Sequence, residues 1–116
     1  MAIFKLKPAC KNYLWGGRRL AEEFNIETDE KILAEAWMLS AHQDGMSIIT
    51  TGKFAGKNFG EYLKQENFPL LIKFIDAEKN LSIQVHPDDS YALKNENQFG
   101  KDEFWYILDA APNAFI

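Results

Sequence analysis

The clearest pattern of apolar and polar positions lies between residues 81 and 86. Three aliphatic side chains alternate there with three polar ones, in the order Leu81, Ser82, Ile83, Gln84, Val85 and His86. A period of two is typical of a β-strand with one apolar and one polar face. Pro87 and the aspartates that follow it end this strand. Asp88 or Asp89 can then cap a helical turn that continues through Leu93.

Short strands and brief helices are predicted along the rest of the chain. Strands are expected over residues 3–7, 35–40, 46–50, 70–75 and 103–108, and helices over 18–24 and from Asn58 toward Gln65. The almost continuous apolar run of residues 70–75 indicates a strand buried on both faces. Asp44 and Gly45 predict a turn that joins the strands on either side of it, and residues 99–101 predict another. This mixture favours a mainly β or an α+β fold.

Composition indicates one folded domain over residues 1–116, with no internal boundary. The chain has 116 residues, of which 47% are apolar and 26% charged, and its net charge is −4. Domains commonly have about this length. So many apolar residues with so little net charge exclude intrinsic disorder. A mildly acidic chain without basic clusters is a poor partner for nucleic acid or for an anionic membrane surface.

We expect neither a signal peptide nor a membrane span. No window approaches the roughly 20 apolar residues that a spanning helix needs, and residues 1–8 lack the apolar stretch of a signal peptide. Cys10 is the single cysteine, so no disulfide framework and no thiolate metal cluster is expected. These features predict a cytoplasmic protein.

Three polar side chains near the predicted strand 81–86 could form a metal site. Gln84 and His86 are two positions apart, so both leave the same face of the strand, about 6–7 Å from each other at Cα. Glu103 begins the next predicted strand and could lie opposite them. One imidazole, one carboxylate and one amide oxygen suit a divalent cation such as zinc. The alternative is a surface histidine and an ordinary solvated acid.

Other polar residues carry weaker signals. Lys73 interrupts the apolar run 70–75 and must extend to solvent, pair with an acid or face a polar cavity; an exposed edge lysine is the alternative. Lys101 fits a solvated turn, and His42 a polar loop, with a catalytic role for His42 as the alternative. The aromatic segment 13–17 could form a wall of a binding cleft or part of a plain core. Glu35 alone indicates nothing.

Five stretches, taken together and in this order, resemble the type I mannose-6-phosphate isomerases, or phosphomannose isomerases. They are residues 13–17, 34–42, 69–77, 81–89 and 100–108. The Gln-x-His-Pro motif at Gln84, combined with the Gly-Lys-x-Glu-x-Trp-Tyr motif at Gly100, makes the resemblance highly specific. It covers nearly the whole chain.

The resemblance implies a mainly β fold with short helices, an incomplete cupin-like jelly roll. It also implies an isomerase that interconverts mannose 6-phosphate and fructose 6-phosphate, with one zinc ion per complete site. Gln84, His86 and Glu103 match metal ligands of the family. Substrate-binding positions correspond to Trp15, Lys73 and Lys101, and the two lysines are also the expected catalytic residues.

The resemblance also implies that family members continue well beyond residues 103–108. Their later part supplies another histidine ligand and further basic residues. We therefore expect these 116 residues to be the N-terminal part of such an enzyme, with open sheet edges through which the chain can self-associate. A second hypothesis is a non-catalytic cupin-like module that binds metal or a sugar phosphate, or an inactive fragment. The general base and the substrate range stay open.

Overall fold

The computed structural model describes residues 3–64 and 68–115. It contains two compact units, one up to Leu81 and one from Ser82 onward. The expectation of one domain without an internal boundary stays a prediction. No helix within the described ranges is long and apolar enough to cross a lipid bilayer.

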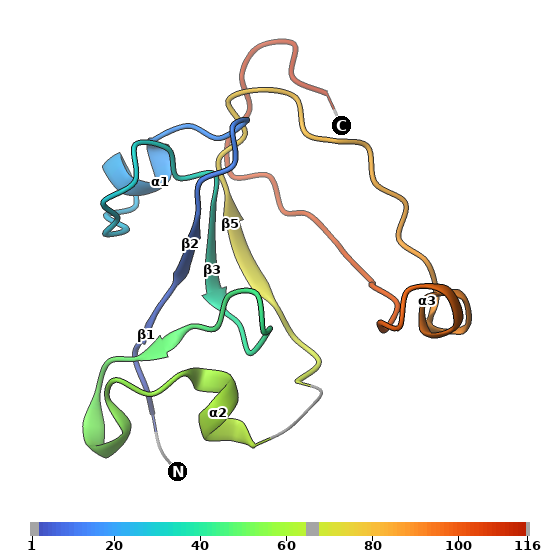
Figure 1. The fold of residues 1–116 in the computed structure, drawn as a ribbon. Coiled ribbons are helices and arrows are strands. Elements are labelled where there is room, and N and C mark those ends of the chain that lie inside the picture. The colour runs from blue at the N-terminus through green and yellow to red at the C-terminus, as the bar shows by residue number, and fades with distance from the viewer. Residues whose placement is uncertain (1–2, 65–67, 116) are drawn as a thin grey trace. The chain divides into compact units, whose positions relative to one another are not determined.

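Two antiparallel sheets form the framework of the first unit (Figure 1). The larger sheet has the order β2-β3-β5, and the smaller pairs β1 with β4. The strands are β1 (Leu6–Lys7), β2 (Ala9–Lys11), β3 (Glu35–Leu39), β4 (Ile48–Ile49) and β5 (Ile72–Ile75). Short helices connect them: α1 (Arg19–Glu22), the 3₁₀ turn η1 (Gly52–Phe54) and α2 (Phe59–Leu63).

The hydrophobic core of this unit lies on one face of the larger sheet. Ala36 of β3 packs there with three buried residues from α1 and the segment that follows it, namely Leu20, Ile26 and Leu33. Partly buried Cys10, Met38 and Phe74 surround them. Side chains alternate along a strand, so Glu35 and Trp37 lie on the face opposite Ala36.

Several predicted elements of this unit are confirmed with changed details. The strand at 70–75 is present as β5, but Ile72 is 43% exposed, so the strand is not buried on both faces. The turn at Asp44 forms, yet β4 pairs with β1 rather than with β3. The reason is that β2 and β5 already occupy both edges of β3. Strand β2, beyond Pro8, was not predicted.

Residues 82–115 contain one helix and long extended segments. Helix α3 (Asp89–Asn95) begins after Asp88, as predicted. The chain bends at residues 96–98 rather than at the predicted 99–101, and Asn97 has a φ of 53° there. For α2, which was predicted to begin at Asn58, the expected end at Gln65 lies outside the described residues.

The strands predicted over residues 81–86 and 103–108 are wrong as secondary structure. Neither segment is a strand within residues 68–115, and apolar side chains along them are exposed, with Ile83 fully so. A strand needs a neighbour to accept and donate its backbone hydrogen bonds, and no strand pairing in the described chain includes these segments. The predicted self-association through open edges stays a prediction.

Candidate functional site

His86 and Glu103 meet in the second unit. The Nε2 atom of His86 lies 2.5 Å from Oε2 of Glu103. Lys101 Nζ lies 3.3 Å from the same carboxylate oxygen. The side chains of the pair are 23% and 26% exposed, so solvent still reaches both. One carboxylate therefore joins an imidazole and an ammonium group in a single polar cluster.

The charge of Glu103 is stabilised by this cluster. Burial alone raises the pKa of its carboxyl, but hydrogen bonds from His86 and Lys101, and attraction to both groups, lower it more. The pKa of Glu103 consequently lies below its ordinary value. A carboxylate that stays ionised at neutral pH can bind a cation.

The third predicted ligand lies two residues before His86. The amide of Gln84 donates a hydrogen bond of 3.3 Å to the Ser82 hydroxyl. No cluster of three or more histidine, cysteine, aspartate or glutamate side chains that could hold a metal occurs in residues 3–64 and 68–115. The available donors are instead one imidazole nitrogen, one carboxylate and one amide oxygen. This donor set fits a borderline divalent cation such as zinc, which accepts nitrogen and oxygen ligands.

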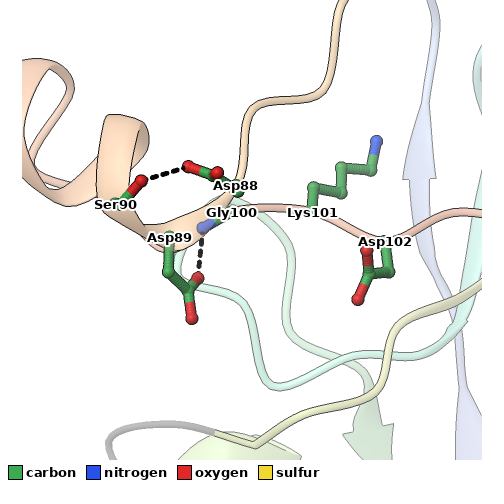
Figure 2. A pocket seen from close by; sticks show the side chains of 6 residues that line it. All are labelled: Asp88, Asp89, Ser90, Gly100, Lys101 and Asp102. Atoms are coloured by element: carbon green, nitrogen blue, oxygen red, sulfur yellow. Dashed lines mark hydrogen bonds between the residues drawn. The ribbon is translucent and has the colours of Figure 1, made fainter.

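Hydrogen bonds around the start of α3 hold together the two segments that carry His86 and Glu103. Asp89 Oδ1 accepts from the backbone N–H of Gly100 at 2.8 Å, and the Pro87 carbonyl accepts from Lys101 N–H at 3.3 Å. A hollow of about 390 Å³ lies here, lined by Asp88, Asp89, Ser90, Gly100, Lys101 and Asp102. Figure 2 shows how these residues lie. The contacts join the segment after His86 to the segment before Glu103.

Asp88 caps α3 at this point. Its Oδ1 accepts from the Tyr91 backbone N–H at 2.9 Å and from the Ser90 hydroxyl at 2.7 Å. The hydrogen bond from Tyr91 is the main cause of a pKa lower than usual for Asp88. The cap fixes where α3 starts, and with it the backbone that follows His86.

Loss of this cap is expected to loosen α3. In Asp88→Ala, the Tyr91 N–H loses its acceptor, so hydrogen–deuterium exchange of the Tyr91 and Ala92 amides should speed up several-fold. Asp102→Ala is the matched control, because Asp102 lines the same hollow outside any helix. Equal exchange in both variants would show that the cap does not stabilise α3.

Lys73 belongs to a second polar cluster, in the first unit. Its Nζ lies 3.2 Å from Oε2 of Glu35 and 4.8 Å from the ring centroid of Trp37. The Trp37 indole donates a hydrogen bond of 2.6 Å to the same Glu35 oxygen. Of the alternatives for Lys73, the structure therefore selects pairing with an acid. Glu35 was not predicted as a site residue. The sequence signal that could have indicated it is the Glu-x-Trp pattern on one predicted strand together with a lysine on another.

Trp15 is placed in the aromatic segment of the same unit. Its ring stacks on Tyr13 with centroids 5.6 Å apart. Burial raises the pKa of the Tyr13 hydroxyl, and the negative charges of Glu35 and Asp44 raise it further. The charge of Glu35, which pairs with Lys73, therefore acts on the Tyr13 hydroxyl. His42 packs edge-on against Trp37, 5.7 Å between ring centroids.

The chain is thus a mainly β protein with candidate metal-binding and substrate-binding residues. The family model for the catalytic domain of phosphomannose isomerase type I matches residues 3–111. The chain therefore belongs to the type I phosphomannose isomerase family.

Known proteins agree with this assignment. A probable mannose-6-phosphate isomerase of Bacillus subtilis, GmuF, is 40% identical over 94% of this chain and 38% of its own length. The mannose-6-phosphate isomerase of Streptococcus mutans is 39% identical over 89% of this chain and 36% of its own.

A solved structure supports the fold. The crystal structure of the mannose 6-phosphate isomerase from Bacillus subtilis matches 86% of this chain with a TM-score of 0.81 and 33% identity, and the match covers 35% of that protein. The chain thus spans less than two fifths of the length of these relatives. The predicted fold class, an incomplete cupin-type fold, is confirmed.

Proposed function

We propose that the chain carries part of the active site of an aldose–ketose isomerase that interconverts mannose 6-phosphate and fructose 6-phosphate. The observation that carries the proposal is the cluster of His86, Glu103 and Lys101, with contacts of 2.5 and 3.3 Å, in a chain of the phosphomannose isomerase family. The partner is then a small sugar phosphate, and the place of action the cytoplasm.

Zinc is the proposed metal, with Gln84, His86 and Glu103 as its protein ligands. When bound, it would polarise the oxygens at C1 and C2 of the sugar and stabilise negative charge that develops on them. The His86 imidazole can coordinate only when neutral, and Glu103 only when ionised. The lowered pKa of Glu103 is consistent with that requirement.

The proposed substrate contacts are Lys73, Lys101 and Trp15. Isomerisation moves a proton from C2 of the aldose to C1 of the ketose, while a hydroxyl proton moves from O2 to O1 through an enediol. Each ammonium group can donate hydrogen bonds to sugar oxygens or to the phosphate as a point charge. The Trp15 ring offers a flat apolar surface for the carbon side of the sugar.

Turnover by the chain, and its loss on changing Lys73, tests this proposal. The chain is expected to convert mannose 6-phosphate to fructose 6-phosphate in the presence of zinc. Lys73→Gln, which removes the charge but keeps a hydrogen-bond donor, should lower kcat/KM by about 10²- to 10⁴-fold. A coupled assay for fructose 6-phosphate measures both, with circular dichroism to confirm folding.

Lys94→Gln is the matched control, because Lys94 lies exposed on α3. This variant should keep the full rate. No turnover by the unmodified chain at any zinc concentration would refute the proposed activity for these 116 residues. An equal loss in both variants would refute the assignment of Lys73.

A further inference from the structure

We propose that Glu35 and Trp37 are positioning residues for Lys73, and hold its ammonium group in one pose before substrate arrives. The inference rests on the proposed function and deepens it. It gives a role to two side chains of β3 that are not themselves expected to contact the sugar.

Strand register places the three residues on one face. Trp37 of β3 lies directly opposite Lys73 of β5 in the antiparallel pair. Glu35 is two positions before Trp37 on the same strand, so the two side chains leave the sheet on the same side. Directly opposite residues in such a pair have Cβ atoms about 4.5–5.5 Å apart. The sheet itself therefore brings the carboxylate, the indole and the lysine together.

One carboxylate oxygen of Glu35 contacts both the Trp37 indole and the Lys73 ammonium group. Oε2 of Glu35 accepts from the Trp37 indole at 2.6 Å and lies 3.2 Å from Lys73 Nζ. The Lys73 ammonium also lies 4.8 Å from the Trp37 ring centroid, within the range of a cation–π contact. A lysine side chain has four rotatable bonds and loses considerable entropy when it is held. Two contacts, one with a charge and one with a ring face, restrict the side chain before any ligand binds.

The opposite side of the network is restrained as well. Lys11 Nζ lies 4.5 Å from the centroid of the same indole and donates a hydrogen bond to the Asp44 backbone carbonyl. Its ammonium thus makes a second cation–π contact with Trp37. The indole that orients Glu35 is accordingly fixed by contacts with two lysines and one carboxylate.

Stability alone is a weak reason for this arrangement. The Glu35 and Lys73 side chains are only 10% and 19% exposed, and burying two charges costs about as much as their attraction returns. An apolar pair would fill the same space at no such cost. A preorganised ammonium, by contrast, needs no reorganisation when charge develops on a substrate oxygen.

Nuclear magnetic resonance can observe the pose directly. Because the Lys73 ammonium lies over the face of the Trp37 indole, the ring current should shift the Hε resonances of Lys73 upfield. In Glu35→Gln, the amide oxygen still accepts the indole hydrogen bond but carries no negative charge to hold the ammonium group. The Lys73 Hε signals are therefore expected to move toward those of exposed lysines such as Lys79. Unchanged signals in this variant would overturn the proposal.

Asp76→Asn is the matched control. Asp76 is as buried as Glu35 and follows β5 directly, but its Oδ2 accepts from the Arg19 backbone N–H at 2.8 Å. The same carboxylate-to-amide change should leave the Lys73 resonances in place. If it moves them as far as Glu35→Gln does, the effect is general loosening of the sheet and positioning is refuted.

Kinetics separate positioning from structure. Glu35→Gln should lower kcat by about 10- to 100-fold per folded molecule, with a much smaller change in KM. If Glu35→Gln does not fold, Trp37→Phe decides, because it keeps a ring but removes the donor that orients Glu35. It should displace the Lys73 resonances and lower kcat in the same direction. The resonance shift needs no turnover, so a chain without isomerase activity would refute the proposed function and still test the pose.

Discussion

Gly16→Ala is expected to destabilise the first unit by about 3 kcal/mol or more, the upper part of the range for overpacking. A Cβ at Gly16 would lie 2.3 Å from both Cα and Cβ of Ala34 and 2.8 Å from its backbone nitrogen. Two of these are backbone atoms and the third is the Cβ of a fully buried alanine beside β3, so no side-chain rotation can relieve the overlap. Urea unfolding, followed by circular dichroism, measures the loss.

The same substitution also affects the aromatic segment. Gly16 donates a hydrogen bond to the Tyr13 carbonyl at 3.0 Å and forms an isolated bridge with Ala77. Pushing it away from Ala34 would therefore displace the adjacent Trp15. In the isomerase assay, any activity that remains in Gly16→Ala is expected to show a raised KM.

Gly56→Ala is the control for Gly16→Ala. Nothing lies within 4 Å of a Cβ built at Gly56, and its φ is +87°. The substitution should therefore lower the free energy of unfolding only by the strain of a left-handed backbone, about 1–2 kcal/mol. If both variants lose the same stability, the close approach of Gly16 to Ala34 is not what constrains this position.

Apart from β2, the strands that have partners in the described chain were predictable from local pattern. The apolar run around Phe74 and the predicted strand from Glu35 both became strands because β3 lies between two neighbours. Residues 81–86 alternate more regularly than either, yet form no strand. Alternation says which face could be buried, but a strand also requires hydrogen-bond partners. Those partners are remote in sequence, so local pattern could not supply them.

The sequence predicted that His86 and Glu103 lie close together, but the structure brings them together in a different way. Sequence reasoning placed Glu103 near His86 by pairing two strands. The structure brings them to 2.5 Å through hydrogen bonds between the start of α3 and the segment at Gly100. Glu35 was not found, because its importance depends on the register that sets Lys73 opposite Trp37. Register is a tertiary property, so the Glu-x-Trp pattern alone could not show that Lys73 lies opposite Trp37.

Removal of either His86 or Glu103 is expected to abolish measurable zinc binding. Changes to groups that merely support metal ligands already cost about 10- to 100-fold in affinity, so loss of a ligand should cost at least as much. In the unmodified chain, zinc should bind weakly and be partly lost on dialysis, because Gln84, His86 and Glu103 leave the ion with few protein ligands. Competition with a chromophoric chelator gives each affinity, and elemental analysis gives the zinc that remains.

His42→Ala is the control for His86→Ala. The two are the only histidines in the sequence, and the His42 ring contacts Trp37 and lies 3.7 Å from the Asp44 carboxylate. Glu103→Gln provides an independent test, because it keeps the size of the side chain and removes the charge. Zinc affinity should fall in His86→Ala and Glu103→Gln and stay unchanged in His42→Ala. One equivalent of zinc that survives dialysis would contradict a weak three-ligand site, and equal affinity in all variants would place any zinc elsewhere.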